Sequence, residues 1–485
     1  MADGLCHLSL FRKGLGLLLG IMSLAVIADP VNQEPASPSF YGHRAITQDA
    51  VEDAPPKIEF QRRAIAPPIA PIESHVESLT PALSNTQPHT TDHVPSHPLS
   101  NHVLTLIDET IPLSRDELLL AKKAQYYIDR NWQEETGFIN SVQGYPHSTM
   151  WDIASGLSAI LSLEGLGLYS TEETELKIQR TLDTLSSLVL YDNRLPNREY
   201  STHTAQPSGS MSQTAQKGNG WSALDIGRLL IWLEITARHK PQLKSDITTI
   251  LTRWQLDDAV HQQTLYGEKN TSYKRFYRQE GRLGYLQYTA HGFDMAGFDV
   301  RKAFADEPTT TAQLNGHTLY IDTRNLPYFT SDPYVLHAIE LGRTDAWWDQ
   351  LDTLFTLHKK QSQSEKALWI FAEDALNQAP WFSYNNIFIY GRAWVSTAPG
   401  GKPIENPQIF SNKMALGFSV LFPEDPFGQQ LHQQVIDNSL PYRAIPTGVL
   451  RDAAPNLAFN INTNAFILSA LWYKHRAYQP LILAP

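Results

Sequence analysis

The feature that most constrains the fold is a series of helical patterns joined by connections of alternating length. About twelve stretches after Ser114 show helical periodicity, and HTLYID is the best of very few candidate strands. Short connections follow the second and fourth helices, whereas long ones precede the second, fourth, sixth and last. In an up-and-down arrangement the long connections would gather on one face. Because no solenoid-length repeat is present, we expect an all-α fold, an (α/α)6 toroid of about twelve helices.

The first helix is expected to begin at a capping box made by Ser114 and Glu117. The remaining helices are expected near 150–166, 170–190, 221–239, 241–256, 284 onward, 332–342, 345–364, 385–396, 409–422, 425–438 and 461–477. The alternation of connection lengths breaks down around 300–330 and 366–384.

The sequence before this domain has a different composition. Twelve of the 31 prolines lie between Pro30 and Pro98. Such a segment cannot bury enough apolar surface to offset the entropy lost on ordering. We predict a disordered Pro-rich tether over 29–104 and a toroid domain over 105–485, and a peptide ligand for another envelope protein is the alternative reading of the tether.

The N-terminus predicts export. Arg12 and Lys13 precede an uncharged apolar run from Gly14 to Ala28, which is typical of a signal peptide. That run is shorter than the roughly 17–25 residues of a bilayer span. Residues 1–28 are therefore a signal peptide, or an inner-membrane anchor if they are not cleaved, and we expect a periplasmic or extracellular protein. The single cysteine, Cys6, lies in this segment, so the mature chain has no thiol chemistry.

Charge and motifs exclude several function classes. The formal charge of −11 argues against a nucleic-acid partner. The sequence contains no GxxxxGK[ST], HExxH or GxSxG motif. We expect no cofactor and no metal site, although calcium bound by carboxylates remains an alternative, and the oligomeric state stays open. A glycan or oligosaccharide is the expected partner.

Five segments place carboxylates, amides and aromatic residues at expected helix starts: 144–152, 218–225, 278–293, 371–385 and 460–468. Aromatic faces suit the C–H face of a sugar, while carboxylates and amides bind its hydroxyls. The expected substrate-binding residues are Trp151, Trp221, Asp225, Arg282, Tyr285, Gln287, Trp381, Tyr384, Asn385 and Asn464.

Glycoside hydrolysis needs a protonated acid and a second carboxylate. Glu280 is the first candidate for the acid, and the glycines at 281 and 284 suggest that a ligand approaches the backbone closely there. Asp374, Glu373 and Asp152 compete for the second role, and we favour inversion with Asp374 ahead of Asp152 as base.

Each of these residues also has a structural interpretation. Asp152 and Asp225 could satisfy helix N-termini, as could Asn464 at the start of the last helix. Glu280 could form a solvated ion pair with Arg282. Trp151 and Trp221 could belong to the core. The collection of such residues at helix starts, and no single motif, therefore favours a functional site.

The segments GYPHSTMWD, GWSALDIGRLL, EGRLGYLQY, AEDALNQAPWFSYN and NTNAFIL resemble the bacterial domain-of-unknown-function family 3131. The resemblance covers about 115–477. It implies a fold similar to the six-hairpin glycosidases and a distant relationship to β-glucan-cleaving enzymes. The family tends to carry another acid where this chain has Asn377, which weakens a catalytic role for that position.

The resulting hypothesis is an exported carbohydrate-active protein, a glycoside hydrolase of an envelope or extracellular glucan. The alternatives are a non-catalytic glycan-binding envelope protein and a structural partner of a polysaccharide synthesis or export complex. The sequence does not specify the sugar, the linkage or the stereochemical outcome.

The change in composition near Leu104 generates a first test. Limited proteolysis of the full chain should remove the tether and leave a resistant fragment that contains all of 105–485. Stable cleavage into two halves within that range would contradict a single toroid domain.

Overall fold

The computed structural model of the chain describes residues 110–305, 309–322, 329–343, 349–389, 391–399 and 401–484. The predicted signal segment and tether lie outside these ranges. Within them, no helix combines the length and the apolar character that a membrane crossing requires.

The described part of the chain contains eleven α-helices. They are α2 Arg115–Asn131, α3 Met150–Gly165, α4 Thr171–Ser187, α5 Ala223–His239, α6 Lys244–Arg253, α7 Tyr285–Met295, α8 Asp332–Glu340, α9 Gln350–Glu365, α10 Asn412–Leu421, α11 Pro426–Ser439 and α12 Ile461–His475. The predicted capping box of Ser114 and Glu117 opens α2. Eleven of the twelve predicted helices are therefore present near their predicted positions.

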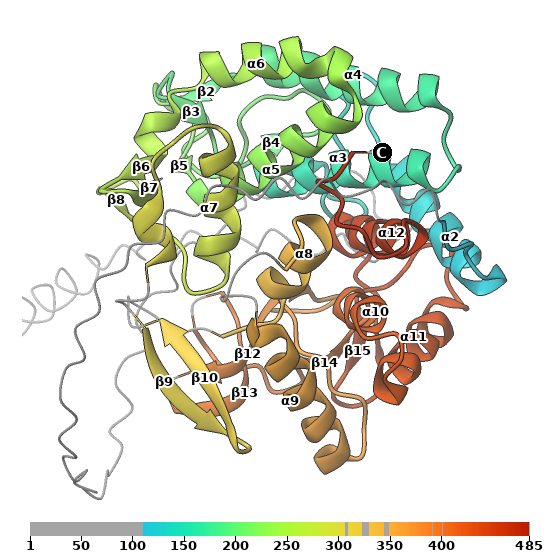
Figure 1. Ribbon diagram of the computed structural model, residues 1–485. Helices are drawn as coiled ribbons and strands as arrows, with labels where there is room; N and C mark the ends of the chain where they lie inside the picture. The colour runs from blue at the N-terminus through green and yellow to red at the C-terminus, as the bar shows by residue number, and fades with distance from the viewer. Residues whose placement is uncertain are drawn as a thin grey trace, which may run out of the picture.

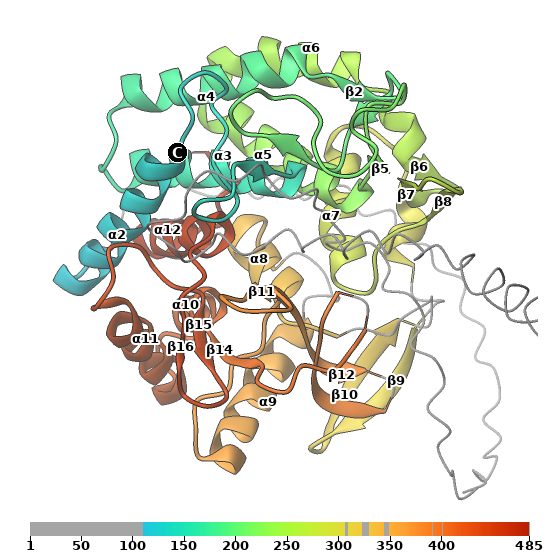
Figure 2. The same ribbon diagram turned by 180° about the vertical axis from the view of Figure 1, so that it is seen from behind.

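Six of these helices form the inner part of the fold. α3 packs on α5, α5 on α7, α7 on α8, α8 on α10, α10 on α12, and α12 returns to α3, so the contacts close a ring (Figure 1). α2, α4, α6, α9 and α11 lie outside this ring (Figures 1 and 2). The inner helices are apolar almost all round, and every residue of α3 from Met150 to Leu163 is buried.

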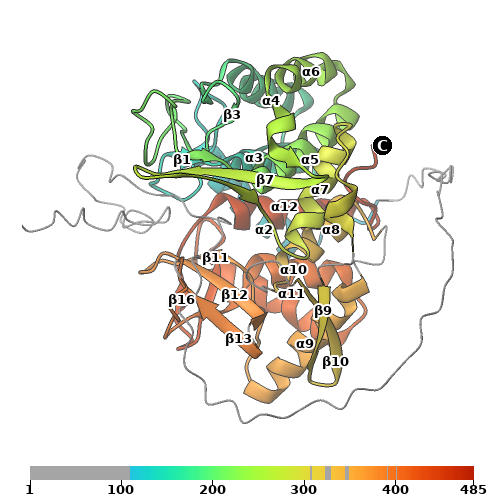
Figure 3. The ribbon, with the colours of Figure 1, turned by 90° about the vertical axis from the view of Figure 1, so that its left-hand side faces the viewer.

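The N-termini of the inner helices lie at the same end of the ring. Asp152, in the first turn of α3, accepts a hydrogen bond from Asn462 in the first turn of α12. Lys413 at the start of α10 forms an ion pair with Asp332 at the start of α8. The connections that precede these helices therefore meet at one end, and Figure 3 shows strands β1, β11 and β16 on that side of the helices.

The connections form small antiparallel sheets, so the expectation of an all-α fold is too simple. The strands are β1 His147–Ser148, β2 Leu190–Tyr191, β3 Leu195–Pro196, β4 Tyr200–Ser201, β5 Gly220–Trp221, β6 Val260–His261, β7 Thr264–Asn270, β8 Arg275–Gln279, β9 Thr309–Leu314, β10 His317–Asp322, β11 Asp374–Ala375, β12 Phe382–Ile389, β13 Arg392–Thr397, β14 Gln408–Ser411, β15 Gly448–Leu450 and β16 Pro455–Asn456. HTLYID is β10, as predicted, and pairs with β9.

The predicted helix at 385–396 is wrong. This segment forms the hairpin of β12 and β13, in which Asn385 pairs with Ser396 and Phe388 with Ala393. Aromatic and β-branched residues dominate both strands, and Gly391 in the turn adopts a φ of +74° that suits glycine. The helical periodicity of the apolar residues is misleading because β12 is buried on both faces and so lacks the alternation of a strand.

Close contact between α5 and α7 depends on two glycines. A Cβ at Gly292 would lie 2.0 Å from the carbonyl oxygen of Gly227, and a Cβ at Gly227 would lie 2.4 Å from that of Thr289. Neither backbone can move without shifting a whole inner helix. These glycines therefore set the separation of α5 and α7.

Gly292→Ala should lower the free energy of unfolding by about 1–3 kcal/mol, because the added methyl forces the two helices apart. Gly156→Ala is the matched control, since its Cβ would be 3.4 Å from the Ile139 side chain. That change should stabilise the protein by up to about 1 kcal/mol through helix propensity. Urea unfolding of the two variants measures both effects, and equal stability of Gly292→Ala and the parent would contradict the packing argument.

Candidate functional site

The five segments singled out in the sequence come into contact at the N-terminal end of the inner ring. Tyr285 donates a hydrogen bond of 3.0 Å to Glu373, which joins the third segment to the fourth. Glu280 accepts a 2.7 Å hydrogen bond from the backbone N–H of Ala223, which joins the third to the second. Asp152 and Asn462 join the first to the last. Whether these residues line one cavity stays a prediction.

Glu280 is buried immediately after strand β8. Its Oε2 caps the N-terminus of α5 through Ala223, and its Oε1 lies 3.5 Å from Nη1 of Arg198. Both side chains of this ion pair are almost fully buried. Glu280 thus accepts a hydrogen bond at one carboxyl oxygen and faces a guanidinium at the other. The cation that pairs with Glu280 is thus Arg198, and the pair is not a solvated one.

The glycines that follow Glu280 contact protein. A Cβ at Gly281 would meet Leu224 and Leu286, and a Cβ at Gly284 would meet Pro333 and Tyr334. Both glycines also have a φ above +90°. Close packing of α5, α7 and α8 and the positive φ values therefore account for both glycines, and the approach of a ligand to this backbone stays a prediction.

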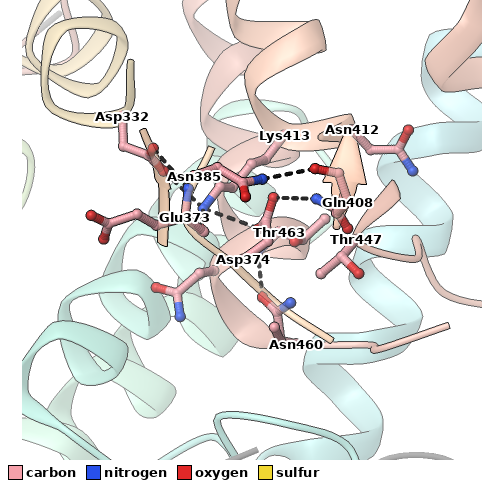
Figure 4. Close-up of polar contacts among 12 residues, drawn as sticks. Asp332, Glu373, Asp374, Asn385, Gln408, Asn412, Lys413, Thr447, Asn460 and Thr463 are labelled. Atoms are coloured by element: carbon pink, nitrogen blue, oxygen red, sulfur yellow. Dashed lines mark hydrogen bonds and ion pairs between the residues drawn. The ribbon is translucent and has the colours of Figure 1, made fainter. Parts of the chain in front are cut away.

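Glu373 and Asp374 lie in a buried polar network around Lys413 (Figure 4). The Lys413 ammonium is 3.1 Å from Asp374 and 3.0 Å from Asp332, and it donates a hydrogen bond to the backbone carbonyl of Glu373. Gln408 donates a 2.7 Å hydrogen bond to Asp374. Burial raises the pKa of Asp374, and Lys413 opposes that rise. Asp374 therefore anchors this segment, whereas the Glu373 side chain points to Tyr285.

Several predicted site residues satisfy backbone or side-chain groups of the protein. Asp152 forms the capping box of α3 with Thr149. Gln287 accepts from the Gly284 N–H and donates to the Ala303 carbonyl. The other such contacts are Asn464 with Ile445, Asn385 with Gln408 and Ser396, and the Asp225 backbone with Ser222. The capping interpretation is confirmed for Asp152. It is wrong for Asn464, because Asn460 caps α12 and the Asn464 side chain binds the backbone of Ile445.

The two tryptophans are covered by protein. Trp221 is completely buried between Tyr191 and Tyr277, and its Nε1 donates to the carbonyl of Tyr266. Trp151 packs edge-on against Tyr285, and the guanidinium of Arg228 lies 4.3 Å from its ring centre. Both therefore support the site and do not present a free face in this structure.

The remaining predicted residues lie around the same end. Tyr384 packs with Tyr145, Ala375 and Phe382 in a small apolar cluster, against which the partly buried Trp381 rests. Arg282 is buried and donates hydrogen bonds to Gln279 and to the carbonyl of Gly281. The apolar cluster joins the first and fourth segments.

Sequence reasoning missed Glu199, which lies in the long connection before α5. It is 1% exposed. Its Oε1 accepts a 2.7 Å hydrogen bond from Tyr145 and lies 3.4 Å from Nδ1 of His147, and its Oε2 is buried without a hydrogen-bond partner among the described residues. Burial raises the pKa of Glu199 to about 8, with a further contribution from the charge of Asp152. Burial therefore favours the protonated form of Glu199.

Glu199 and Arg198 carry no sequence signal, because PNREYS is an ordinary polar loop. Their proximity to Tyr145 and Glu280 arises only when the long connections meet. Within the described ranges, no group of three or more His, Cys, Asp or Glu side chains could hold a metal ion.

The comparisons with known proteins agree with this arrangement. The family described as "Protein of unknown function (DUF3131)" matches residues 119–477. No curated protein matches the sequence.

Solved structures share the fold at low sequence identity. An endo-β-1,2-glucanase from Chitinophaga pinensis, solved with sophorotriose and glucose, is similar with a TM-score of 0.54 and 12% identity, over 76% of this chain and 96% of that one. A proposed glucoamylase from Bacteroides caccae has a TM-score of 0.53 and 12% sequence identity, and the match covers 76% of this chain and 97% of that one. A β-1,2-glucanase from Parabacteroides distasonis has a TM-score of 0.50 and 11% sequence identity, and the match covers 75% of this chain and 57% of that one. At these identities the likeness shows a glycoside-hydrolase-like fold.

The raised pKa of Glu199 predicts a pH-dependent stability. The folded protein holds this proton up to about pH 8, whereas an unfolded glutamate releases it near 4.5. The resulting stabilisation is complete below about pH 4.5 and is lost as the pH rises towards 8. Glu199→Gln, which mimics the protonated acid, should remove this part of the pH dependence.

Urea unfolding from pH 4 to 9 measures the effect as a difference between parent and variant. Glu234→Gln, on the surface of α5, is the control and should follow the parent. Parallel curves for Glu199→Gln and the parent would show that Glu199 is ionised in the folded protein.

Proposed function

The chain belongs to the DUF3131 family, and we propose that it is an exported glycoside hydrolase that acts on an envelope or extracellular glucan. The proposal places the site at the N-terminal end of an (α/α)6 toroid, in the periplasm or outside the cell. The glucanase and glucoamylase titles of its structural neighbours support the substrate class.

The observation that carries the proposal is the different setting of two buried glutamates at this end of the ring. Arg198 pairs with Glu280, whereas burial raises the pKa of the next residue, Glu199, to about 8. Hydrolysis needs one carboxyl group that keeps its proton and a second that acts as carboxylate. Arg198, which pairs with Glu280, and Glu199 are thus consecutive residues of one connection.

We assign the acid to Glu199 and the base to Glu280. Glu199 gives its proton to the glycosidic oxygen as the C–O bond breaks. The Glu280 carboxylate takes a proton from a water molecule. The oxygen of this water bonds to the anomeric carbon, and the attack inverts the configuration there. The ion pair with Arg198 favours this assignment over the acid role that the sequence suggested for Glu280.

The other sequence-predicted carboxylates have supporting positions in this proposal. Asp152 and Asp374 are held by hydrogen bonds and by Lys413, so they fix the ends of α3 and of the 371–385 segment. Glu373, which accepts from Tyr285, is the alternative base.

A panel of glucans, including β-1,2-linked ones, tests the proposal by release of reducing ends and by binding. Glu199→Gln and Glu280→Gln should each keep binding and lower turnover by at least ~100-fold. The turnover of the parent should fall above about pH 8, where Glu199 loses its proton. Glu234→Gln is the control.

Full hydrolysis by Glu199→Gln would remove that residue from the mechanism. Binding of a glycan by the parent without any release of reducing ends would favour the non-catalytic glycan-binding protein. Neither binding nor hydrolysis would favour a structural partner of a polysaccharide complex.

A further inference from the structure

The hairpin of β7 and β8 leads directly to Glu280 and presents a row of side chains on one face. Side chains alternate along a strand, so Phe276, Arg278 and Glu280 share a face. Gly267 lies opposite Arg278 in the paired strand. A Cβ at Gly267 would be 2.3 Å from the Glu280 carboxylate, which confirms that this carboxylate lies over the same face.

Arg278 has hydrogen-bonding capacity that the protein does not use. Its guanidinium is half-buried and lies within the electrostatic reach of Glu280, and its side chain makes no hydrogen bond to any residue in the described ranges. A guanidinium offers five donors in a planar fork. The donors of Arg278 are therefore available to acceptor atoms of a ligand.

The opposite face of the hairpin is already occupied. Tyr277 packs against Tyr266 and Trp221 there, and Arg275 pairs with Asp192 at 3.2 Å. Arg275, on that face, thus has a carboxylate partner, whereas the Arg278 side chain has no hydrogen-bond partner among the described residues.

The outer end of the row offers an aromatic surface. Phe276 is 38% exposed, and the Lys274 ammonium lies 5.3 Å from its ring centre. An exposed ring beside cationic groups suits a sugar whose C–H face stacks and whose substituent is negatively charged.

The charge of this region is opposite to that of the whole protein. On the face that carries Glu280, the hairpin has three cations (Lys269, Lys274 and Arg278) against this one carboxylate, in a chain of net charge −11. Arg198 adds a further guanidinium beside Glu280. Neutral hydroxyls would not need such a concentration of positive charge.

We propose that the β7–β8 hairpin binds an acidic group on the glycan. The Arg278 guanidinium binds this acidic group, and the sugar that carries the group stacks on the Phe276 ring. The substrate is thus an anionic glucan, substituted with a carboxylate or a phosphate close to the bond that is cleaved. This inference rests on the proposed function, because it specifies the substrate of the same site.

The test compares three probes on the full chain: a β-glucan oligosaccharide, the same oligosaccharide oxidised to carboxylate at C6, and its phosphate-substituted form. The parent should bind at least one acidic probe at least ~10-fold more tightly than the neutral one, and added salt should weaken that preference. Calorimetric titration gives each affinity. The carboxylate and phosphate arms distinguish the two sources of charge.

Arg278→Gln should remove the preference for the acidic probe and leave the affinity for the neutral probe within about twofold. Arg278→Lys should retain part of the preference, because it keeps the charge but loses the fork. The matched control is Arg238→Gln, which removes an exposed arginine from the other end of α5 and should bind as the parent does.

Each contrary outcome has its own meaning. If the parent binds neutral and acidic probes equally, or if Arg278→Gln weakens both equally, the acidic-substrate inference is wrong while the proposed function stands. If the parent binds none of the probes and no other glycan of the panel, both are overturned.

Discussion

The arrangement of the site depends on the convergence of six helix N-termini at one end of a ring. Each N-terminus leaves backbone N–H groups without intrahelical partners and carries a partial positive charge. When six of them meet in a largely buried region, acceptors must come from side chains. Asp152 does this for α3, Glu280 for α5 and Asn460 for α12. Carboxylates therefore accumulate at this end for reasons of folding alone.

The same constraint explains which part of the site the sequence could predict. Carboxylates and amides at helix starts were recognised, and they do lie together, because every inner helix begins at the same end. Their roles could not be separated, since an N-cap and a ligand-binding group use the same residue types. Asp152, Gln287 and Asn464 turned out to satisfy the fold. Glu199, in a loop of unremarkable composition, was invisible because its burial depends on Tyr145 and Asp152 from another segment.

The helices of the fold could be predicted from the sequence, whereas most of the strands in the connections could not. Helices were predicted well because their apolar faces and capping residues are local features, as Ser114 and Glu117 show. The strands in the connections were predicted poorly. The pairing of two strands depends on the turn between them, and a single segment carries no local sign of its partner. In β12 of the 382–397 hairpin, burial on both faces removed the alternation that identifies a strand. The packing role of the glycines after Glu280 could not be predicted for a related reason, since close packing of distant helices leaves no local pattern.

Buried charge explains how a site with so many structural carboxylates can retain chemically distinct ones. Lys413 is placed between Asp332 and Asp374, which compensates both carboxylates and ties α8, α10 and β11 together. An ion pair in such a place gains little net stability, because desolvation offsets the attraction. Its consequence here is positional: with Asp374 held, the neighbouring Glu373 is directed towards Tyr285. Arg198 does the same on the other side, where it holds Glu280 and leaves Glu199 without a cation. Lys413 thus holds Asp332 and Asp374 in place, whereas Arg198 gives Glu280 a cationic partner that the adjacent Glu199 lacks.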